Sequence, residues 1–472
     1  MIGRKKELQV LEDCKIADRS RLVVVYGRRR VGKTFLVREA FDYHFTFTHT
    51  GIENGTYQEQ LSAFWRSLAE QWREDEPRPR NWMEAFELLK RALKDSPDER
   101  KTVFIDELPW MDTPRSGFVK AIEHFWNGWA SARKDIVLIV CGSAAAWMTK
   151  KILQNKGGLF NRANQTIYLS PFTLAECEQY LLSEGRVMDR KDIASAYMVF
   201  GGAPYYWSLL NKGESLSQGI DRLFFAPGGT LVGEFTRLYR SVFENPEPYV
   251  SIVSALATKK IGMTREELVG AASDVANNGR LTECLGNLEV CGFVRRYVQT
   301  GNTRRESIYQ LVDNYTLFYF SFVKDYAGQD RDHWLHLMKD PRRIVWEGLA
   351  FERVCLQHVD QIKRALGISG VATDVSEWHW RSDEPLAKGA QIDLVIERGD
   401  HVTNLCEMKF ASEEFEVSAD CAKELREKCA VFKRETKTKN ACHVTFVTTY
   451  GVKRGKNTSI VQSEVTLDEL FA

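Results

Sequence analysis

The chain has 472 residues, more than one hydrophobic core usually organises, so three or four domains are expected. Lys and Arg number 65 against 64 Asp and Glu, and the formal net charge of +1 argues against a strong overall attraction to nucleic acid, although local basic clusters can still contact DNA. The ten cysteines include no CxxC pair, which disfavours a zinc site or a disulfide framework and fits reduced thiols. The charged N-terminus and the absence of a long apolar run predict a cytoplasmic protein without membrane contact.

A glycine-rich loop follows the apolar run over residues 22–26 and matches the phosphate-binding pattern GxxxxGK[ST]. In this pattern the backbone N–H groups face the phosphates of a nucleotide such as ATP, the lysine supplies a mobile charge and the last hydroxyl binds Mg²⁺. A helix beginning at the lysine adds its positive end to the same anion site. A chance match in a solvated loop is disfavoured by the strand before and the helix after. The residues predicted to bind the nucleotide here are Gly27, Arg28, Arg29, Arg30, Val31, Gly32, Lys33 and Thr34.

A second apolar run, residues 102–105, ends in Asp106 and Glu107. Asp106 is expected to hold Mg²⁺ together with Thr34, and Glu107 to polarise the water that attacks the γ-phosphate. The alternative is an acidic pair that merely ends a strand. A small-molecule kinase would not need the second carboxylate, so the pair favours hydrolysis.

A third apolar run, residues 136–141, leads to Gly142 and Ser143. Three such runs interleaved with helical stretches predict a parallel sheet covered on both faces. Ser143 could sense the γ-phosphate from the neighbouring strand, or the Gly-Ser turn could have a purely local role. Arg162 has two interpretations: an arginine that reaches the γ-phosphate in cis or from a neighbouring subunit, and a surface arginine beside a glycine turn.

Residues 174–240 are expected to be helical, with a rigid break at residues 201–206 that contains Gly202 and Pro204. Beyond Tyr249 the pattern predicts helices around residues 252–256, 264–268 and 280–288, and then a hairpin over residues 293–312. These features describe a winged helix-turn-helix, a module that binds DNA in many proteins and serves as a packing or protein-contact unit in others. Residues 282–289 carry few positive charges, which disfavours a helix that reads bases. The aromatic residues between 315 and 346 are expected to be core.

The C-terminal part contains a predicted β-hairpin that carries charged residues. Residues 391–396 alternate as a strand, residues 397–400 turn, and residues 404–410 return. Side chains alternate along a strand, so Asp393, Glu407 and Lys409 can share one face. Two nearby carboxylates suit Mg²⁺ or Mn²⁺, and a lysine beside them can orient or deprotonate a water that attacks a phosphodiester. Glu352, on a helix upstream, is a candidate third ligand and suits this better than Glu347. The alternative is an exposed hairpin whose charges form a salt bridge in water.

Taken together, these motifs resemble the archaeal-type ATPases of the STAND division of P-loop proteins. This AAA+-related group often ends in a PD-(D/E)xK nuclease-like domain. The resemblance rests on the residue 27–34 loop, the Asp106-Glu107 strand end, the strand leading to Ser143, the Gly202-Ala-Pro204 segment and the Asp393…Glu407-Met-Lys409 hairpin. Members often carry Leu-Tyr-Gly-Arg where this chain has Leu-Phe-Asn before Arg162.

The resemblance implies an α/β fold in four domains: a P-loop ATPase core with a parallel sheet (residues 1–173), a helical lid (174–245), a winged helix (246–330) and a restriction-endonuclease-like α/β domain (331–472). It implies that Gly202 and Pro204 belong to the nucleotide site of the lid. The expected function is an ATP-driven switch coupled to DNA binding and to metal-dependent cleavage, with a homo-oligomer possible. The alternative is a regulatory ATPase whose C-terminal domain holds DNA or protein without cutting it.

Overall fold

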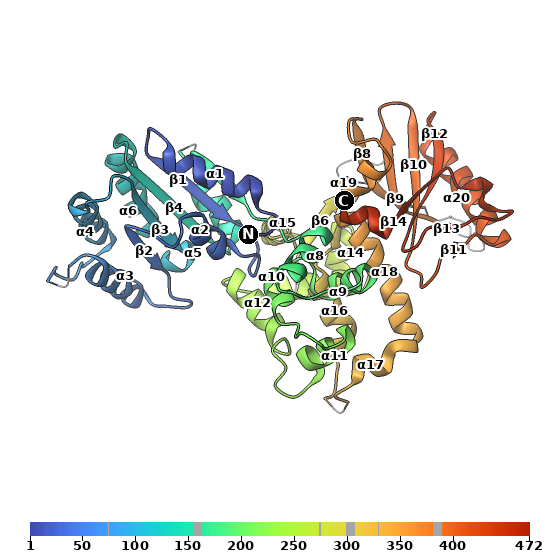
Figure 1. The fold of residues 1–472 in the computed structure, drawn as a ribbon, viewed down its shortest axis with the longest axis horizontal. Helices are drawn as coiled ribbons and strands as arrows, with labels where there is room; N and C mark the ends of the chain where they lie inside the picture. Colours follow the sequence, from blue (N-terminus) through green and yellow to red (C-terminus); the bar gives the residue numbers. More distant parts are fainter. Residues whose placement is uncertain (74, 155–161, 273–274, 299–306, 329, 381–388) are drawn as a thin grey trace. The chain divides into compact units, whose positions relative to one another are not determined.

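The computed structural model describes residues 1–73, 75–154, 162–272, 275–298, 307–328, 330–380 and 389–472 (Figure 1). The chain divides into two compact units. Unit 1 holds residues 1–171, 203–205 and 236–246, and unit 2 holds residues 172–202, 206–235 and 247–472. In the described ranges, no helix combines the length and the apolar character that a bilayer span requires.

Unit 1 is built on a parallel five-stranded sheet in the order β2-β3-β4-β1-β5. The strands are β1 (Arg21–Tyr26), β2 (Phe47–Thr50), β3 (Lys101–Asp106), β4 (Ile136–Gly142) and β5 (Gln165–Tyr168). Every residue of β3 and β4 is buried, as the near-continuous apolar runs predict for a sheet covered on both faces. The predicted parallel sheet is therefore confirmed. Because β4 pairs with both β1 and β3, the residues that follow these three strands meet at one edge.

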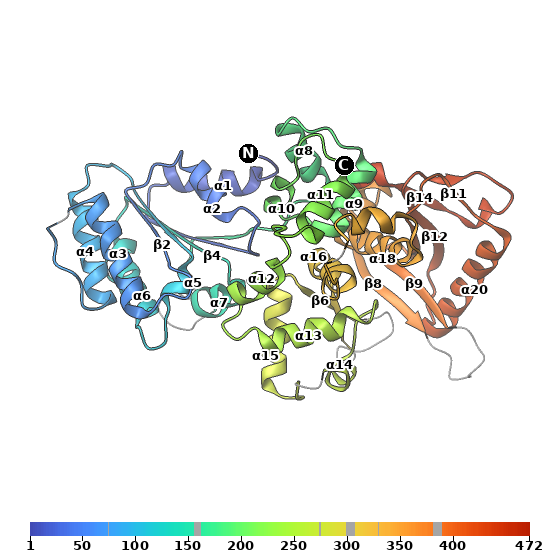
Figure 2. The same cartoon turned by 90° about the horizontal axis from the view of Figure 1, so that it is seen from below.

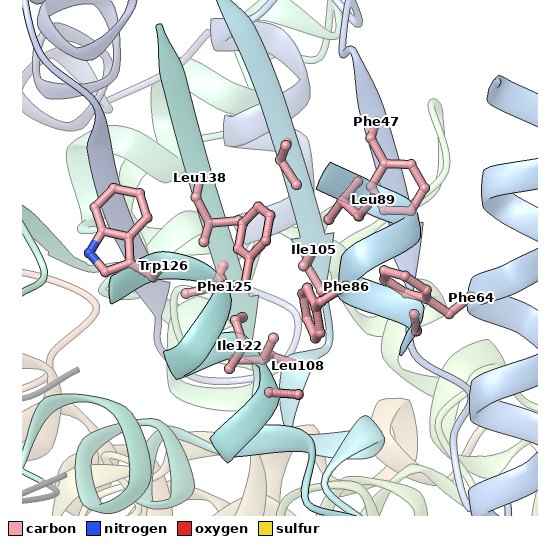
Figure 3. Close-up of a cluster of buried hydrophobic side chains, with 14 of the residues drawn as sticks. Phe47, Phe64, Phe86, Leu89, Ile105, Leu108, Ile122, Phe125, Trp126 and Leu138 are labelled. Carbon is pink, nitrogen blue, oxygen red and sulfur yellow. The ribbon is translucent and has the colours of Figure 1, made fainter. Parts of the chain in front are cut away.

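Helices cover both faces of this sheet, and Figure 2 gives a second view of these layers. The helices of unit 1 are α1 (Lys5–Ile16), α2 (Lys33–Ala40), α3 (Tyr57–Gln71), α4 (Trp82–Asp95), α5 (Leu108–Met111), α6 (Phe118–Gly128), η1 (Ala130–Ala132), α7 (Ala145–Trp147) and η2 (Met148–Leu153). On one face, aromatic side chains of α3, α4 and α6 pack against Ile105 of β3 and Leu138 of β4 (Figure 3). The rings of Phe86 and Phe125 lie 5.4 Å apart in this layer. On the other face, α1 and α2 contribute Leu11 and Leu36 to a separate core.

The middle of the chain is helical, as expected. The elements are α8 (Leu174–Ser183), α9 (Arg190–Phe200), α10 (Pro204–Ser208), α11 (Leu216–Ile220), η3 (Asp221–Phe225) and α12 (Glu234–Val242). Thr173 caps α8 through a reciprocal pair of bonds with Glu176, which satisfies the first N–H groups of the helix. The boundary between the two units falls within α10 and within α12, so each of these helices has residues in both units.

Three helices and an antiparallel strand pair follow. They are α13 (Glu247–Ala257), α14 (Arg265–Ala271), α15 (Gly279–Val290), β6 (Val294–Tyr297) and β7 (Ile308–Leu311). Thr264 caps α14 as its sequence predicts, and Met263 bridges Tyr309 at the edge of β7. The predicted helices and hairpin strands are thus present at the expected positions.

A helical layer connects this segment to the C-terminal sheet. It contains α16 (Asn314–Phe318), η5 (Tyr319–Val323), α17 (His333–His336), η6 (Leu337–Lys339), α18 (Pro341–Gln357) and α19 (Val359–Ala365). Phe318 and Trp334 are buried and their rings lie 5.1 Å apart. The expectation that these aromatics form core is confirmed.

The C-terminal sheet has the order β14-β12-β10-β9-β8. Strands β8 (Thr373–Trp380), β9 (Ala390–Arg398) and β10 (Val402–Lys409) are antiparallel, whereas β10, β12 (Ala441–Thr448) and β14 (Ser463–Thr466) are parallel. The remaining elements are β11 (Phe415–Glu416), α20 (Ala419–Thr436), β13 (Val452–Lys453), η7 (Thr458–Ile460) and η8 (Leu467–Phe471). Phe432 of α20 packs on Trp378 of β8, while α18 contacts β10. The predicted hairpin of β9 and β10 is confirmed.

Candidate functional site

The loop between β1 and α2 depends on two glycines. Gly27 has φ of 149°, and a Cβ atom there would lie 2.5 Å from the carbonyl oxygen of Leu169. Gly32 has φ of 88° and is the N-cap of α2. Only glycine adopts both conformations without strain, so the chain can turn sharply and direct backbone N–H groups into the loop.

Lys33 is the first residue of α2, and its side chain folds back over the loop. It is 5% exposed, and its Nζ donates a 2.9 Å hydrogen bond to the carbonyl oxygen of Arg28. Val31 is buried in the core beside α2, which anchors the loop. The lysine is therefore held at the mouth of the loop by a backbone oxygen that a phosphate oxygen can replace.

The three arginine side chains of the loop have different environments. Arg28 is buried, and Arg29 forms an ion pair with Glu53 at 3.4 Å. Arg30 has φ of 75°, and its guanidinium lies 3.9 Å from the centre of the Tyr205 ring. A cation on an aromatic face at this distance is attracted by the ring quadrupole.

Thr34 and Asp106 meet across the sheet edge. The Thr34 hydroxyl donates a 2.7 Å hydrogen bond to Asp106 Oδ2, and Asp106 is 4% exposed. Hydroxyl and carboxylate oxygens are the donors that Mg²⁺ prefers. These two residues therefore fit that cation, in agreement with the sequence-based prediction of their proximity.

Glu107 is held by Ser143. The Ser143 N–H donates to Glu107 Oε2 at 3.0 Å, and the Ser143 hydroxyl donates to Oε1. Glu107 has φ of 47°, a left-handed conformation that is uncommon outside glycine and often marks a functional residue. Both carboxylate oxygens thus accept bonds from one residue, which directly follows the adjacent strand β4. Sequence reasoning placed Ser143 near this site but did not foresee its bonds to Glu107.

Gly202, Pro204 and Arg162 were also expected to reach the nucleotide. At Gly202, a Cβ atom would lie 1.9 Å from the carbonyl oxygen of Phe172, so close backbone packing requires glycine there. Pro204 opens α10, where a missing N–H costs nothing. Arg162 is exposed on the turn before β5, and the preceding residues 155–161 lie outside the described residues. The nucleotide-contacting roles of these three residues remain predictions.

The second candidate site lies in unit 2, on the β9–β10 hairpin. Asp393 and Glu407 are 8% and 9% exposed, which excludes the alternative of a hairpin whose acids face water. Lys409 Nζ donates to Glu407 Oε1 at 2.8 Å, and the Met408 N–H donates to Asp393 Oδ2 at 3.2 Å. The hairpin therefore brings the two buried acids and the half-buried lysine to one face of the sheet, as the strand alternation predicts.

Two further lysines enter this region. Lys428 of α20 donates to Glu407 Oε2 at 3.0 Å. Lys260, from the turn after α13, lies 2.6 Å from Glu352 Oε2, 2.8 Å from Glu352 Oε1 and 3.8 Å from Asp393 Oδ1. Sequence reasoning missed both. Lys428 lies on a helix whose charges suggest only a solvated face, and Lys260 is 92 residues from Glu352 with no local signal of a site.

Burial and charge shift the carboxyl pKa values in opposite directions. Burial, with help from Asp393, raises the pKa of Glu352 to about 7 against the opposing effect of Lys260. Burial, together with Glu407, raises the pKa of Asp393. Burial alone would raise the pKa of Glu407, but Lys409 and Lys428 outweigh it and the pKa is lowered. The lysines thus keep Glu407 ionised.

In the observed conformation, Glu352, Asp393 and Glu407 are not arranged as a metal-binding site. Within the described ranges, no three His, Cys, Asp or Glu side chains are gathered so that they could hold a metal ion. Glu352 is paired with Lys260, and Glu407 with two lysines. The predicted ligands Glu352, Asp393 and Glu407 are therefore close to one another but neutralised by ammonium groups, an arrangement that does not fit a bound divalent cation as it stands.

Residues 1–210 match the family of ATPase domains found predominantly in Archaea. This match agrees with the sequence-based expectation of an archaeal-type ATPase domain in the N-terminal region.

Two proteins of Methanocaldococcus jannaschii are similar in sequence. One, an uncharacterized protein, is 24% identical over 336 residues, which is 68% of this chain and 68% of that protein. The other, an uncharacterized ATP-binding protein, is 45% identical over 38 residues, which is 8% of this chain and 64% of that protein.

Two solved structures also show similarity, at low sequence identity. The Walker-type ATPase of Pyrococcus abyssi is 16% identical with a TM-score of 0.48, and the match covers 68% of this chain and 96% of that one. The ORC2 protein of Aeropyrum pernix, in complexes with ADPNP and ADP, is 15% identical with a TM-score of 0.39, covering 72% of this chain and 95% of that one.

Proposed function

We propose that this protein is an ATP-hydrolysing switch whose nucleotide state is coupled to DNA binding and to metal-dependent DNA cleavage by its C-terminal domain. The observation that carries the ATPase part is the meeting of Lys33, Thr34, Asp106 and Glu107 at one edge of the parallel sheet, with Thr34 bonded to Asp106 at 2.7 Å. We also propose four domains, at residues 1–173, 174–245, 246–330 (a winged helix with a connecting helix) and 331–472, and assembly into a homo-oligomer.

The residues of the loop would bind and orient the phosphates of ATP. Phosphate oxygens replace the Arg28 carbonyl as the partner of Lys33, and the N–H groups at the start of α2 face the same anion. Mg²⁺ held by Thr34 and Asp106 would neutralise charge on the β- and γ-phosphates. Gly27 through Gly32 keep the backbone close enough for these contacts, because a side chain at Gly27 would collide with Leu169.

Glu107 would orient the attacking water and accept its proton. In the observed conformation each of its oxygens accepts one bond from Ser143, which orients the carboxylate and competes with the attacking water for it. Ser143 follows the neighbouring strand β4, where a bound γ-phosphate could compete for its hydroxyl. This arrangement supports a role for Ser143 in reporting the γ-phosphate to Glu107. Arg162 is proposed to add charge stabilisation from the same chain or from a neighbour.

Residues 246–330 are proposed to form a winged helix. The support is the order of three helices and one antiparallel hairpin, with the Met263–Tyr309 bridge beside the hairpin. Thr282 and Glu283 are exposed on α15, and this face offers no cluster of positive charge for a base-reading helix. The proposed contact is therefore with the DNA backbone or with protein.

The C-terminal domain is proposed to cleave DNA with Mg²⁺ or Mn²⁺. Its support is the burial of Asp393 and Glu407 on one hairpin, where Lys409 pairs with Glu407 and Lys260 pairs with both Glu352 and Asp393. A second candidate function is a regulatory ATPase that does not cut, and the lysine partners of Glu352 and Glu407 favour it. No hydrolytic step is assigned to the acids in their lysine-paired form.

One experiment separates these functions. Linear, supercoiled and branched DNA are incubated with Mn²⁺ or Mg²⁺, with and without ATP, using the full chain, Lys409→Ala and Lys33→Ala. Cleavage that disappears in Lys409→Ala and responds to ATP or to Lys33→Ala supports the ATP-controlled nuclease. No cleavage on any substrate, with intact ATP turnover, supports the regulatory switch. Cleavage that persists in Lys409→Ala refutes the hairpin site.

A further inference from the structure

Lys260 lies where a divalent cation would need to bind. Its Nζ contacts both oxygens of Glu352, at 2.6 and 2.8 Å, and lies 3.8 Å from Asp393 Oδ1. These are the same oxygen atoms that a metal ion bound between Glu352 and Asp393 would use. The lysine comes from the turn between α13 and α14, outside the sheet that carries Asp393.

The backbone of Lys260 is fixed from two sides. Its carbonyl oxygen accepts a 2.8 Å hydrogen bond from Gln310 Nε2 of β7 and a 3.2 Å bond from the guanidinium of Arg353, the residue after Glu352. Gln310 and Arg353 are 1% and 8% exposed. The next carbonyl, of Ile261, accepts from the Tyr297 hydroxyl at 2.8 Å. The position of the turn is thus set by buried bonds, independently of the ion pair.

The hairpin that holds this turn is itself joined to the C-terminal sheet. Arg295 of β6 forms an ion pair with Glu377 of β8, and Gln310 donates to the other Glu377 oxygen at 3.2 Å. Glu377 is 4% exposed. The α13–α14 turn and the acids therefore share one buried polar network, and Lys260 reaches the acids only while this network is in place.

Because both are positively charged, the Lys260 ammonium group and a divalent cation cannot occupy the position between Glu352 and Asp393 at the same time. An ammonium group that contacts Glu352 satisfies its negative charge, and a divalent cation on the same oxygens would lie against that ammonium group in a poorly solvated region, where like charges repel strongly. Lys409 and Lys428 pair with Glu407 instead, so among the described residues Lys260 is the lysine that forms ion pairs with Glu352 and Asp393.

We propose that Lys260 is a built-in cation that occupies the Glu352–Asp393 position and keeps a divalent metal out until the α13–α14 turn withdraws. The turn then acts as an autoinhibitory contact on the C-terminal site. This inference rests on the proposed metal-dependent function of that site.

The test is Mn²⁺ binding to the full chain, measured by electron paramagnetic resonance with the ATP site blocked by Lys33→Ala throughout. Lys260→Met is expected to bind Mn²⁺ at least about tenfold more tightly than the Lys33→Ala parent, since one competing charge is gone. Lys260→Arg, which keeps the charge, should bind as weakly as the parent. Lys259→Met is the matched control, because Lys259 pairs with Glu267 at 2.6 Å, away from the acids, and its substitution should leave Mn²⁺ binding unchanged.

Adding Asp393→Asn distinguishes failure of this inference from failure of the proposed metal-dependent function of the C-terminal site. If binding depends on Asp393 but is equal with and without Lys260→Met, the inference is overturned and the metal site stands. If no Asp393-dependent binding is found in any variant, both are overturned.

A second measurement avoids substitution of Lys260. Acylation of lysines in the Lys33→Ala chain is followed by mass spectrometry with and without Mg²⁺. Mg²⁺ should increase modification of Lys260 and leave Lys259 unchanged, and this increase should vanish in Asp393→Asn. Unchanged Lys260 modification at a Mg²⁺ concentration that fills the site would overturn the inference even if Lys260→Met fails to fold.

Discussion

The carboxylate of Glu107 is held at both oxygens by Ser143, through the backbone N–H at 3.0 Å and through the hydroxyl. This links the end of β3 to the end of β4 across the candidate ATP site. These bonds orient the carboxylate of a general base and lower its basicity, so weakening them is expected to change the rate of hydrolysis.

Ser143→Ala removes the hydroxyl bond and keeps the N–H bond. A hydrogen bond to a charged group contributes about 1.5–3 kcal/mol, so Glu107 should leave this position more often and basal ATP turnover should rise several-fold. Steady-state phosphate release measures this, with Ser143→Thr as the hydroxyl-retaining control. Turnover that falls while ATP affinity is unchanged would contradict the restraining role and favour direct contact between Ser143 and the γ-phosphate.

Gly202→Ala should destabilise the protein. The new Cβ would lie 1.9 Å from the Phe172 carbonyl oxygen, a backbone atom that cannot move aside alone. We expect a loss of about 2–4 kcal/mol in the free energy of unfolding, in the range of severe packing substitutions. Gly270→Ala in α14 is the control, since its Cβ meets nothing within 4 Å and a helical alanine is favoured by roughly 0.5–1 kcal/mol. Equal effects in urea unfolding would refute the close approach.

His358 should make unit 2 sensitive to acid. Its Nε2 accepts from the Leu174 N–H at 3.0 Å and its Nδ1 donates to the Val354 carbonyl at 2.7 Å, so the neutral ring is required. Burial lowers the pKa of His358 to about 4 from 6.5. Because the pKa of His358 is lower in the folded chain than in the unfolded chain, the unfolded chain takes up the proton first as the pH falls. The contribution of His358 to stability is therefore complete above pH 6.5 and is lost as the pH falls toward 4.

The measurement is the urea midpoint between pH 4 and pH 7 for the wild type and His358→Gln, which can keep one bond without titrating. The wild type should lose on the order of 3 kcal/mol more than the variant across this interval. Parallel pH profiles would contradict the assignment.

Much of unit 1 follows from the sequence because its signals are local. The apolar runs of β1, β3 and β4 and the glycines of the loop predict both the sheet and the edge where Thr34 and Asp106 meet. Strand β2 was missed because Phe47–Thr50 is short and three of its four residues are polar, so that only its pairing with β3 makes it a strand.

The C-terminal site was predictable only in part. Strand alternation places Asp393, Glu407 and Lys409 together, since the period of a strand fixes which side chains share a face. Lys260 and Lys428 could not be found this way, because tertiary contacts from a turn and from a helix bring them to the acids. The charge balance of the site, and with it the question of metal access, is a property of the fold.

The most direct test of the account is ATP binding and turnover by the wild type, Lys33→Ala and Glu107→Gln in the presence of Mg²⁺. Glu107→Gln should bind ATP with unchanged or tighter affinity but hydrolyse it roughly 100-fold or more slowly, a typical loss for a general base. Lys33→Ala should lose binding. Wild-type turnover in Glu107→Gln, or unchanged ATP affinity and turnover in Lys33→Ala, would contradict the proposed ATP site.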